Sequence, residues 1–119
     1  MNDQWSIVAR TALREALTAW NDGHVAKMGS FLTPNVVFSS PYVEQNGGKI
    51  VGREAVVEWI VERRKHTSRR EIVAILMGAE TVTIFMKDDV GFVSWQLRAT
   101  PNFLIEEIID SHSVVPEGM

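Results

Sequence analysis

The sequence predicts an α+β domain whose helices come first along the chain and whose mostly antiparallel sheet follows. Apolar residues recur at three- and four-residue steps through the first third, which is typical of helices. Short runs rich in β-branched and aromatic residues, separated by turn residues, fill the second half. Because the chain has 119 residues, we expect a single domain over residues 1–119, with three helices covering one face of the sheet.

The first helix is predicted by one stripe of apolar residues that stops at an Asn-Asp-Gly turn. A short second helix follows, with a buried face from Val25 to Leu32, and Pro34 ends it because proline cannot continue the helical hydrogen-bond ladder. A third helix begins after Gly52, where apolar residues again keep helical spacing. The residues of the first stripe are Trp5, Val8, Ala12, Ala16 and Trp20.

Six strands are expected, two before the third helix and four after it. The first, Val36 to Ser40, closes at Pro41, and the short second strand, Lys49 to Val51, follows an Asn-Gly-Gly turn. We expect residues 113–119 to form a loose tail. The last four strands, predicted to form an antiparallel meander, are Glu71 to Met77, Thr81 to Lys87, Gly91 to Thr100 and Phe103 to His112.

Composition and charge argue against several classes of protein. The formal net charge of −3 disfavours broad nucleic-acid binding, which needs a basic surface. The absence of cysteine rules out a thiolate nucleophile or a zinc–thiolate site. Residues 1–10 do not resemble a signal peptide, and no stretch approaches the roughly 18 to 20 apolar residues that a membrane span needs. We therefore expect a cytoplasmic protein that binds neither nucleic acid nor membranes.

No metal and no cofactor are expected. The three histidines, His24, His66 and His112, are scattered along the chain, whereas a zinc site needs three or four convergent ligands. We expect His24 to be exposed or to cap the second helix, and His66 to lie on the surface. The chain also lacks a phosphate-binding glycine loop and a dinucleotide-binding fingerprint.

One run of basic residues extends from Arg63 to His66 and resumes at Arg69 and Arg70. Its position after the third helix favours a solvated helix end, where cations face the negative pole of the helix dipole. The alternative interpretation is a surface that binds an acidic partner.

Three local patterns between Ala19 and Val56 resemble one known family. They are Ala19-Trp20-Asn21-Asp22-Gly23-His24, Leu32-Thr33-Pro34-Asn35-Val36-Val37-Phe38 and Ile50-Val51-Gly52-Arg53-Glu54-Ala55-Val56. In this order, and followed by four strands, they resemble the SnoaL-like, nuclear transport factor 2-like family. The resemblance implies a cone in which helices pack on a strongly curved sheet around an apolar pocket. The family includes ketosteroid isomerases, polyketide cyclases, epoxide hydrolases and members that only bind or assemble, so the fold does not assign an activity.

The chemistry of a ketosteroid isomerase is not expected here. Such an enzyme needs a carboxylate base, together with a tyrosine and a protonated aspartic acid that form an oxyanion hole. The resemblance places Ser40, Ala16 and Trp95 at these three positions. A serine hydroxyl cannot remove a carbon-bound proton without an activating base of its own. The sequence therefore argues against isomerase activity.

This chain has only some of the catalytic residues that limonene-type epoxide hydrolases use. These enzymes use two aspartates bridged by an arginine, and Asp110 on the last strand resembles one of the aspartates. No arginine-x-aspartate pair precedes it, since Arg98 is followed by Ala99 and Thr100. Side chains alternate along a strand, so Arg98 also lies on the face opposite to that of Trp95.

Asp110 and His112 are the candidate catalytic residues. They would suit chemistry like that of polyketide cyclases, which need one acid or base beside a pocket. The two residues lie two positions apart, so a regular strand points both to one face, which Glu106 and Ile108 share. A carboxylate beside an imidazole can tune the imidazole as a general base. The alternative is that the strand frays here and both side chains are solvated.

A pocket with aromatic walls is predicted to bind a hydrophobic small molecule, because aromatic rings with a few polar groups are typical of such sites. On the geometry that the resemblance implies, the candidate ligand-binding residues are Trp20, Phe38, Ser40, Trp59 and Trp95. The alternative is that the tryptophans are ordinary core. The domain would then be a non-enzymatic dimerising or ligand-sensing module with a filled pocket.

The outer face of the sheet is expected to meet a second subunit. On the strand from Thr81 to Lys87, Ile84 and Met86 lie on one face, whereas Phe85 lies on the other. One face is covered by the helices, so the other is predicted to form a homodimer.

Overall fold

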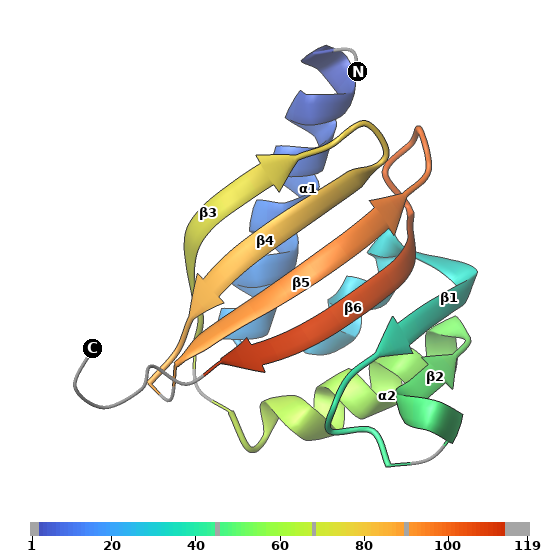
Figure 1. Cartoon of the computed structure of the whole chain (residues 1–119), viewed down its shortest axis with the longest axis vertical. Coiled ribbons are helices and arrows are strands. Elements are labelled where there is room, and N and C mark those ends of the chain that lie inside the picture. Colours follow the sequence, from blue (N-terminus) through green and yellow to red (C-terminus); the bar gives the residue numbers. More distant parts are fainter. Residues whose placement is uncertain (1–2, 45, 68, 90, 114–119) are drawn as a thin grey trace.

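The computed structural model describes residues 3–44, 46–67, 69–89 and 91–113, and it places helices against a single curved sheet (Figure 1). The predicted α+β fold class is confirmed. The helical elements are α1 (Asp3–Asn21), the 3₁₀ helices η1 (Val25–Phe31) and η2 (Asn46–Gly48), and α2 (Arg53–Arg64). The strands are β1 (Leu32–Ser39), β2 (Lys49–Val51), β3 (Glu71–Met77), β4 (Thr81–Lys87), β5 (Phe92–Ala99) and β6 (Ile105–Ser113).

The six strands form one sheet in the order β2-β1-β6-β5-β4-β3. The strands β3 to β6 form the predicted antiparallel meander, in which each strand pairs with the next. β1 pairs with β2 antiparallel but with β6 in parallel. This parallel pair joins strands from opposite halves of the chain, and it brings the end of β1 next to Ile109 in the middle of β6.

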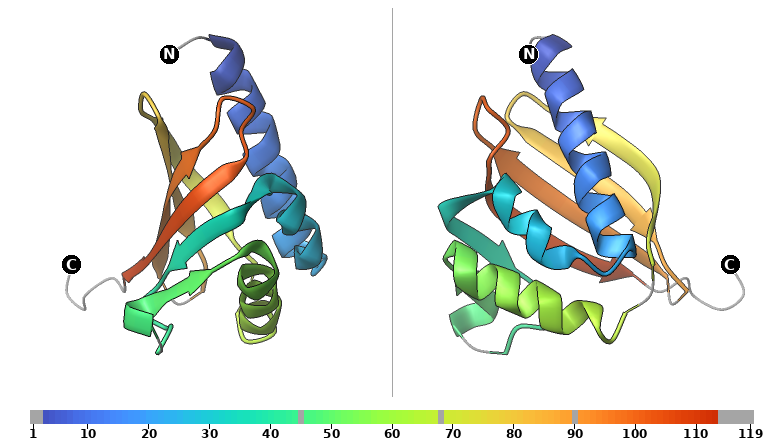
Figure 2. Two further views of the ribbon diagram at one scale, coloured as in Figure 1. Left: turned by 90° about the vertical axis from the view of Figure 1, so that its right-hand side faces the viewer. Right: turned by 180° about the vertical axis from the view of Figure 1, so that it is seen from behind.

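The sheet is strongly curved, and α1 and α2 both lie on its concave side (Figure 2). The core fills the space between these helices and the sheet. On β4 the alternate residues Val82, Ile84 and Met86 are buried, as the two-residue period of a half-covered strand requires. Ala9 and Leu13 are buried on α1, so the helix presents its apolar stripe to the same interior.

The passage from η1 to β1 differs from the sequence prediction. Leu32 is not the last residue of a helix but the first of β1, where it pairs with Ile105 of β6. Pro34 therefore lies inside a strand. The β1–β6 register shifts between Leu32 and Val37, so the missing N–H of Pro34 falls at an irregularity in the ladder, where proline is tolerated. Ser40 lies one residue beyond the end of β1.

The β5–β6 ladder contains a second register shift, between Arg98 and Ala99. Ile105 and Ile108 of β6 are both buried, so two residues separate neighbouring inward-facing side chains at this point. Glu106 consequently pairs with the exposed Arg98, with Oε2 at 3.5 Å from Nε. The prediction that Glu106 shares a face with Ile108 was wrong, because a bulge inverts the alternation.

The predicted tail begins one residue too early. Ser113 is the last residue of β6, where it pairs with Phe92 of β5. Residues 114–119 lie outside the described residues.

Candidate functional site

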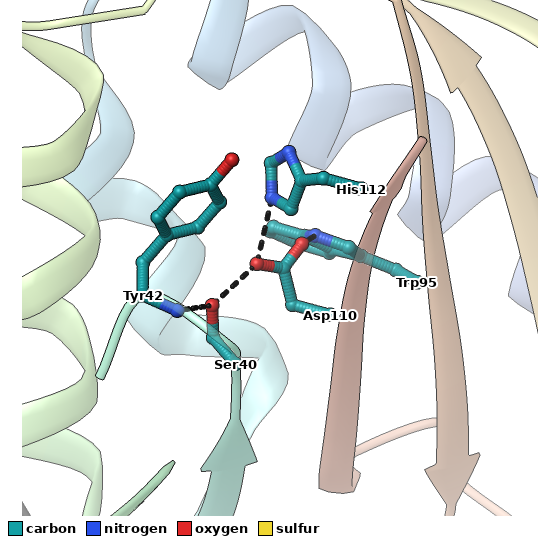
Figure 3. Close-up of polar contacts among 5 residues, drawn as sticks. All are labelled: Ser40, Tyr42, Trp95, Asp110 and His112. Carbon is teal, nitrogen blue, oxygen red and sulfur yellow. Dashed lines mark hydrogen bonds and ion pairs between the residues drawn. The ribbon is translucent and has the colours of Figure 1, made fainter. Parts of the chain in front are cut away.

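Asp110 of β6 is a buried carboxylate at the centre of a hydrogen-bond cluster (Figure 3). Its Oδ2 accepts a hydrogen bond from the Ser40 hydroxyl at 2.8 Å and lies 2.9 Å from Nε2 of His112. Its Oδ1 accepts a hydrogen bond from the indole Nε1 of Trp95 at 2.8 Å. Burying a carboxylate is costly unless its oxygens find donors, and both oxygens of Asp110 have them. We call these four residues the Asp110 cluster.

Each partner reaches Asp110 through a different feature of the sheet. Trp95 is the cross-strand partner of Asp110 in the β5–β6 ladder. His112 lies two residues further along β6, and the two side chains meet, as the alternation of a regular strand predicts. Ser40 directly follows Ser39, which pairs with Ile109 of β6. The alternative in which the strand frays and both side chains are solvated is therefore wrong.

The order of the groups in this cluster limits its chemistry. In a serine nucleophile arrangement, the histidine lies between the serine and the carboxylate and removes the hydroxyl proton. Here Asp110 lies between them, because Ser40 and His112 both contact its Oδ2. Ser40 thus orients Asp110 and is not arranged as a nucleophile that His112 activates.

His112 connects the Asp110 cluster to the protein surface. Its side chain is 18% exposed, whereas that of Asp110 is 3% exposed. Tyr42, which is 47% exposed, covers the imidazole edge-on with ring centroids 4.7 Å apart. The Arg63 guanidinium lies 4.1 Å from the centroid of the Tyr42 ring. Because His112 is partly exposed and contacts Oδ2, a proton that reaches it from solvent is one hydrogen bond away from Asp110.

A small apolar cavity lies between α1 and the concave side of the sheet. Its volume is about 30 Å³, which is room for about two water molecules. Its walls are apolar side chains such as Leu13 and Ile84, and Arg70 is the one charged residue among the described residues that line it. Trp95 separates the cavity from Asp110, because its ring lines the cavity while its Nε1 binds the carboxylate.

The five predicted ligand-binding residues lie close together, but only two of them line the cavity. Trp20 and Trp95 line the cavity, and their rings meet edge-on with centroids 6.3 Å apart. Phe38 is buried between Trp59 and Trp95, at 4.8 Å and 6.2 Å between centroids. Ser40 belongs to the Asp110 cluster, and Trp59 is half-buried against the core. Phe38, Ser40 and Trp59 are not part of the cavity wall, and ligand binding by any of the five stays a prediction.

The interpretation of the basic run as a solvated helix end was wrong for three of its residues, since Arg63 and Arg64 are half-buried and Arg70 is buried. Arg70 is 5% exposed, and its guanidinium lies 4.2 Å from the Trp20 ring centroid and 5.6 Å from that of Trp95. Arg64 is half-buried and donates from Nε to the backbone carbonyl of Trp20 at 2.7 Å. Aromatic rings and backbone carbonyls stabilise arginine out of water, which a count of charges along the chain does not show. The one available signal was the position of Arg70 directly before a strand.

The remaining histidines show no sign of a metal site. His24 is exposed and makes no capping hydrogen bond with its side chain, while His66 lies 3.5 Å from a carboxylate oxygen of Glu62 on the surface. Among the residues that the structure describes, no group of three or more histidine, aspartate or glutamate side chains could hold a metal ion. Within the same part of the chain, no helix is both long and apolar enough to cross a membrane.

Several solved structures share this fold. A SnoaL-like protein of unknown function from Burkholderia thailandensis is 21% identical, with a TM-score of 0.79 over 90% of this chain and 95% of the other. A nuclear transport factor 2-like protein from Anabaena variabilis is 16% identical, with a TM-score of 0.77 over 96% and 92%. A steroid delta-isomerase from Pseudomonas aeruginosa is 17% identical, with a TM-score of 0.73 over 92% and 81%. At these identities the likeness shows the fold alone.

Family membership comes from the sequence itself. A search of curated proteins found no match. The SnoaL-like domain family, in contrast, matches residues 13–115, which include the C-terminal part of α1, all of α2 and all six strands. The match and the architecture agree, and the chain belongs to the SnoaL-like domain family.

Proposed function

We propose that this domain binds a hydrophobic small molecule in the cavity under the sheet, and that Asp110 and His112 act on it as an acid/base pair. The observation that supports this most is the hydrogen bond between the buried Asp110 carboxylate and the partly exposed His112 imidazole. A buried group that can receive protons through a partly exposed one is the arrangement that general acid/base catalysis uses. The residue between this pair and the cavity is Trp95.

In this proposal Asp110 transfers the proton and His112 exchanges it with solvent. Ser40 and Trp95 hold the carboxylate through its two oxygens, so they position Asp110. The ligand enters against the face of Trp95. The cavity must enlarge for this, because its volume of about 30 Å³ is far below the several hundred cubic ångströms of a typical ligand pocket. Met28 and Met86 in its wall have flexible side chains that can move.

The small cavity also favours a second candidate function. In that alternative the pocket is filled by its own side chains, and the domain is a non-enzymatic dimerising or ligand-sensing module. The two candidates differ in whether the interior opens to a ligand and whether the Asp110 cluster alters it.

Native mass spectrometry of the purified protein for a retained small molecule tests the first candidate. We expect a ligand adduct on the wild type and its loss in Trp95→Ala, with Trp5→Ala as the control outside the cavity wall. Asp110→Asn keeps the shape of the side chain but removes the acid, so we expect it to retain the unreacted substrate. Extraction and chromatography separate this substrate from the product held by the wild type, even where the two are isomers of equal mass. Asp22→Asn on the exposed turn is the control for Asp110→Asn.

The outcomes separate the two candidates. Retention of one and the same ligand by wild type, Trp95→Ala and Asp110→Asn would discard the proposed site. A wild type without any retained ligand, even after incubation with hydrophobic compounds, supports the filled-pocket module.

We further propose that the convex face of the sheet forms a homodimer. Leu76 of β3, Phe85 of β4, Phe92 of β5 and Ile109 of β6 are exposed apolar residues on four adjacent strands. Exposed apolar patches of this kind mark interaction surfaces. Light scattering is expected to give a dimer for the wild type and a monomer for Phe85→Glu, while Ile7→Glu on the exposed side of α1 stays dimeric. A monomeric wild type would end this proposal.

A further inference from the structure

Arg70 is a buried cation at the wall of an otherwise apolar cavity, and the proposed acid/base chemistry does not use it. It is 5% exposed, and its Nε has no hydrogen-bond partner among the described residues. A buried donor without an acceptor costs stability, and buried arginines normally satisfy theirs. Arg63 Nε also lacks a partner among the described residues, but of these two arginines only Arg70 lines the cavity. A ligand in the cavity can therefore supply the acceptor that Arg70 lacks.

The fold holds Arg70 in place from its backbone. Asn21, the last residue of α1, accepts from the Arg70 N–H through Oδ1 at 2.7 Å and donates from Nδ2 to the Arg70 carbonyl at 2.9 Å. This pair of hydrogen bonds ties the start of β3 to the end of α1. The guanidinium face then stacks on Trp20, at 4.2 Å from Cζ to the ring centroid. Because an aromatic ring covers a guanidinium face, the N–H groups in its plane are what a ligand can meet.

Charged side chains of both signs act on Arg70. The carboxylates of Asp110 and Asp88 attract its guanidinium, while the guanidinium groups of Arg63 and Arg64 repel it. Burial is the main cause that lowers the pKa of Arg70, yet an arginine side chain keeps its charge in a folded protein.

Arg70 also lies where the apolar cavity meets a polar groove on the surface. The groove has a volume of about 390 Å³, and Arg70 lines both spaces. The other charged residues of the groove carry both signs, with Arg69 and Lys87 opposing Glu71, Asp88 and Asp89. A ligand with an apolar body in the cavity would place a polar head at Arg70, with the groove beyond it.

From the burial, the unused donor and this position, we propose that Arg70 recognises a carboxylate, so that the ligand of the cavity is a hydrophobic carboxylic acid. The proposal rests on the proposed function, since it names the class of molecule that the cavity binds. A carboxylate fits the planar fork of an arginine with two parallel hydrogen bonds, which an alcohol or an amine cannot form.

Calorimetric titration with three probes of one chain length, octanoate, octanol and octylamine, tests the inference. We expect octanoate to bind wild type about tenfold more tightly than octanol, because a hydrogen bond to a charged partner exceeds a neutral one. Octylamine is expected to bind weakest. Arg70→Met should bring octanoate to the affinity of octanol, and Arg70→Lys should keep part of the preference. Arg14→Met, whose exposed side chain lines neither the cavity nor the groove, should keep all of it.

Equal affinities for octanoate and octanol in the wild type would overturn the inference and leave hydrophobic binding intact. An unchanged preference in Arg70→Met would overturn it as well. If none of the three probes binds at millimolar concentration, both the inference and the proposed function fail. Should Arg70→Met not fold by circular dichroism, Arg70→Lys and the wild-type ratio of octanoate to octanol decide the question.

Discussion

Two buried charges flank the indole of Trp95, and the fold surrounds them differently. Asp110 receives hydrogen bonds from Ser40 and Trp95 and contacts His112, so both of its oxygens are occupied. Arg70 stacks on an aromatic ring, but its Nε has no hydrogen-bond partner among the described residues. A charge with satisfied partners is held in one position, whereas an unused donor is available to a new acceptor. Asp110 is therefore held in position as an acid, whereas Arg70 is available to recognise a ligand.

Removing the satisfied charge is expected to have the largest effect. Asp110→Ala leaves the buried Ser40 hydroxyl and Trp95 indole N–H without an acceptor and removes the contact with His112. We therefore expect the free energy of unfolding to fall by about 3 kcal/mol. Urea denaturation measures this change, with Asp22→Ala on the exposed turn as the control. A loss no larger than that of the control would show that the Asp110 cluster adds nothing to stability.

Removing one donor from the Asp110 cluster should have an intermediate effect. Ser40→Ala takes away the hydrogen bond to Oδ2 but leaves Trp95 on Oδ1, so we expect a loss of about 1.5 kcal/mol in the free energy of unfolding. Ser39→Ala, one residue earlier and on β1, is the matched control. If the two variants unfold at the same urea concentration, Ser40 does not hold the carboxylate.

Replacing the unsatisfied charge should have a small effect. Arg70→Met loses the cation–π contact with Trp20 but also removes a costly buried charge, so we expect the free energy of unfolding to stay within about 1 kcal/mol of wild type. Urea denaturation against Arg69→Met measures the difference. A loss as large as that of Asp110→Ala would make Arg70 a structural residue and remove the contrast between the two charges.

The smallest effect on the free energy of unfolding is expected for an exposed ion pair. The pKa of Glu62 on α2 is lowered, first by the hydrogen bond from Lys65, at 3.1 Å, and by the positive charge of that side chain. A lowered pKa stabilises the fold above the unfolded-state pKa, and this stabilisation is lost as pH falls through the folded-state pKa. Lys65→Met is expected to raise the pKa of Glu62 in an NMR titration. The free energy of unfolding should not change measurably, because both side chains are exposed. An unchanged pKa would assign the shift to His66, which also contacts Glu62.

Much of the secondary structure followed from local signals. β3 and β4 have the predicted bounds, because turn residues and runs of β-branched side chains mark the ends of strands within a few positions. The contact between Asp110 and His112 also followed from the alternation of a single strand. Where the ladder has a bulge, at Glu106, the same rule failed.

The contacts that local patterns did not predict are those between distant parts of the chain. Ser40 reaches Asp110 because β1 pairs with β6 in parallel, and no pattern within either strand specifies that pairing. Arg70 is buried because Asn21, 49 positions earlier, holds its backbone and Trp20 receives its guanidinium. The spacing of charged residues along a helix predicts neither contact.

The sequence by itself determined the order of the elements, the face that Asp110 and His112 share, and membership of the SnoaL-like domain family. Those properties depend on neighbours along the chain, on side-chain periodicity and on motifs of a few residues. Only the tertiary structure decided the partners of Asp110, the burial of Arg70 and the cavity volume of about 30 Å³. These depend on how distant segments pack, because burial and hydrogen bonding are properties of the three-dimensional arrangement and not of local spacing.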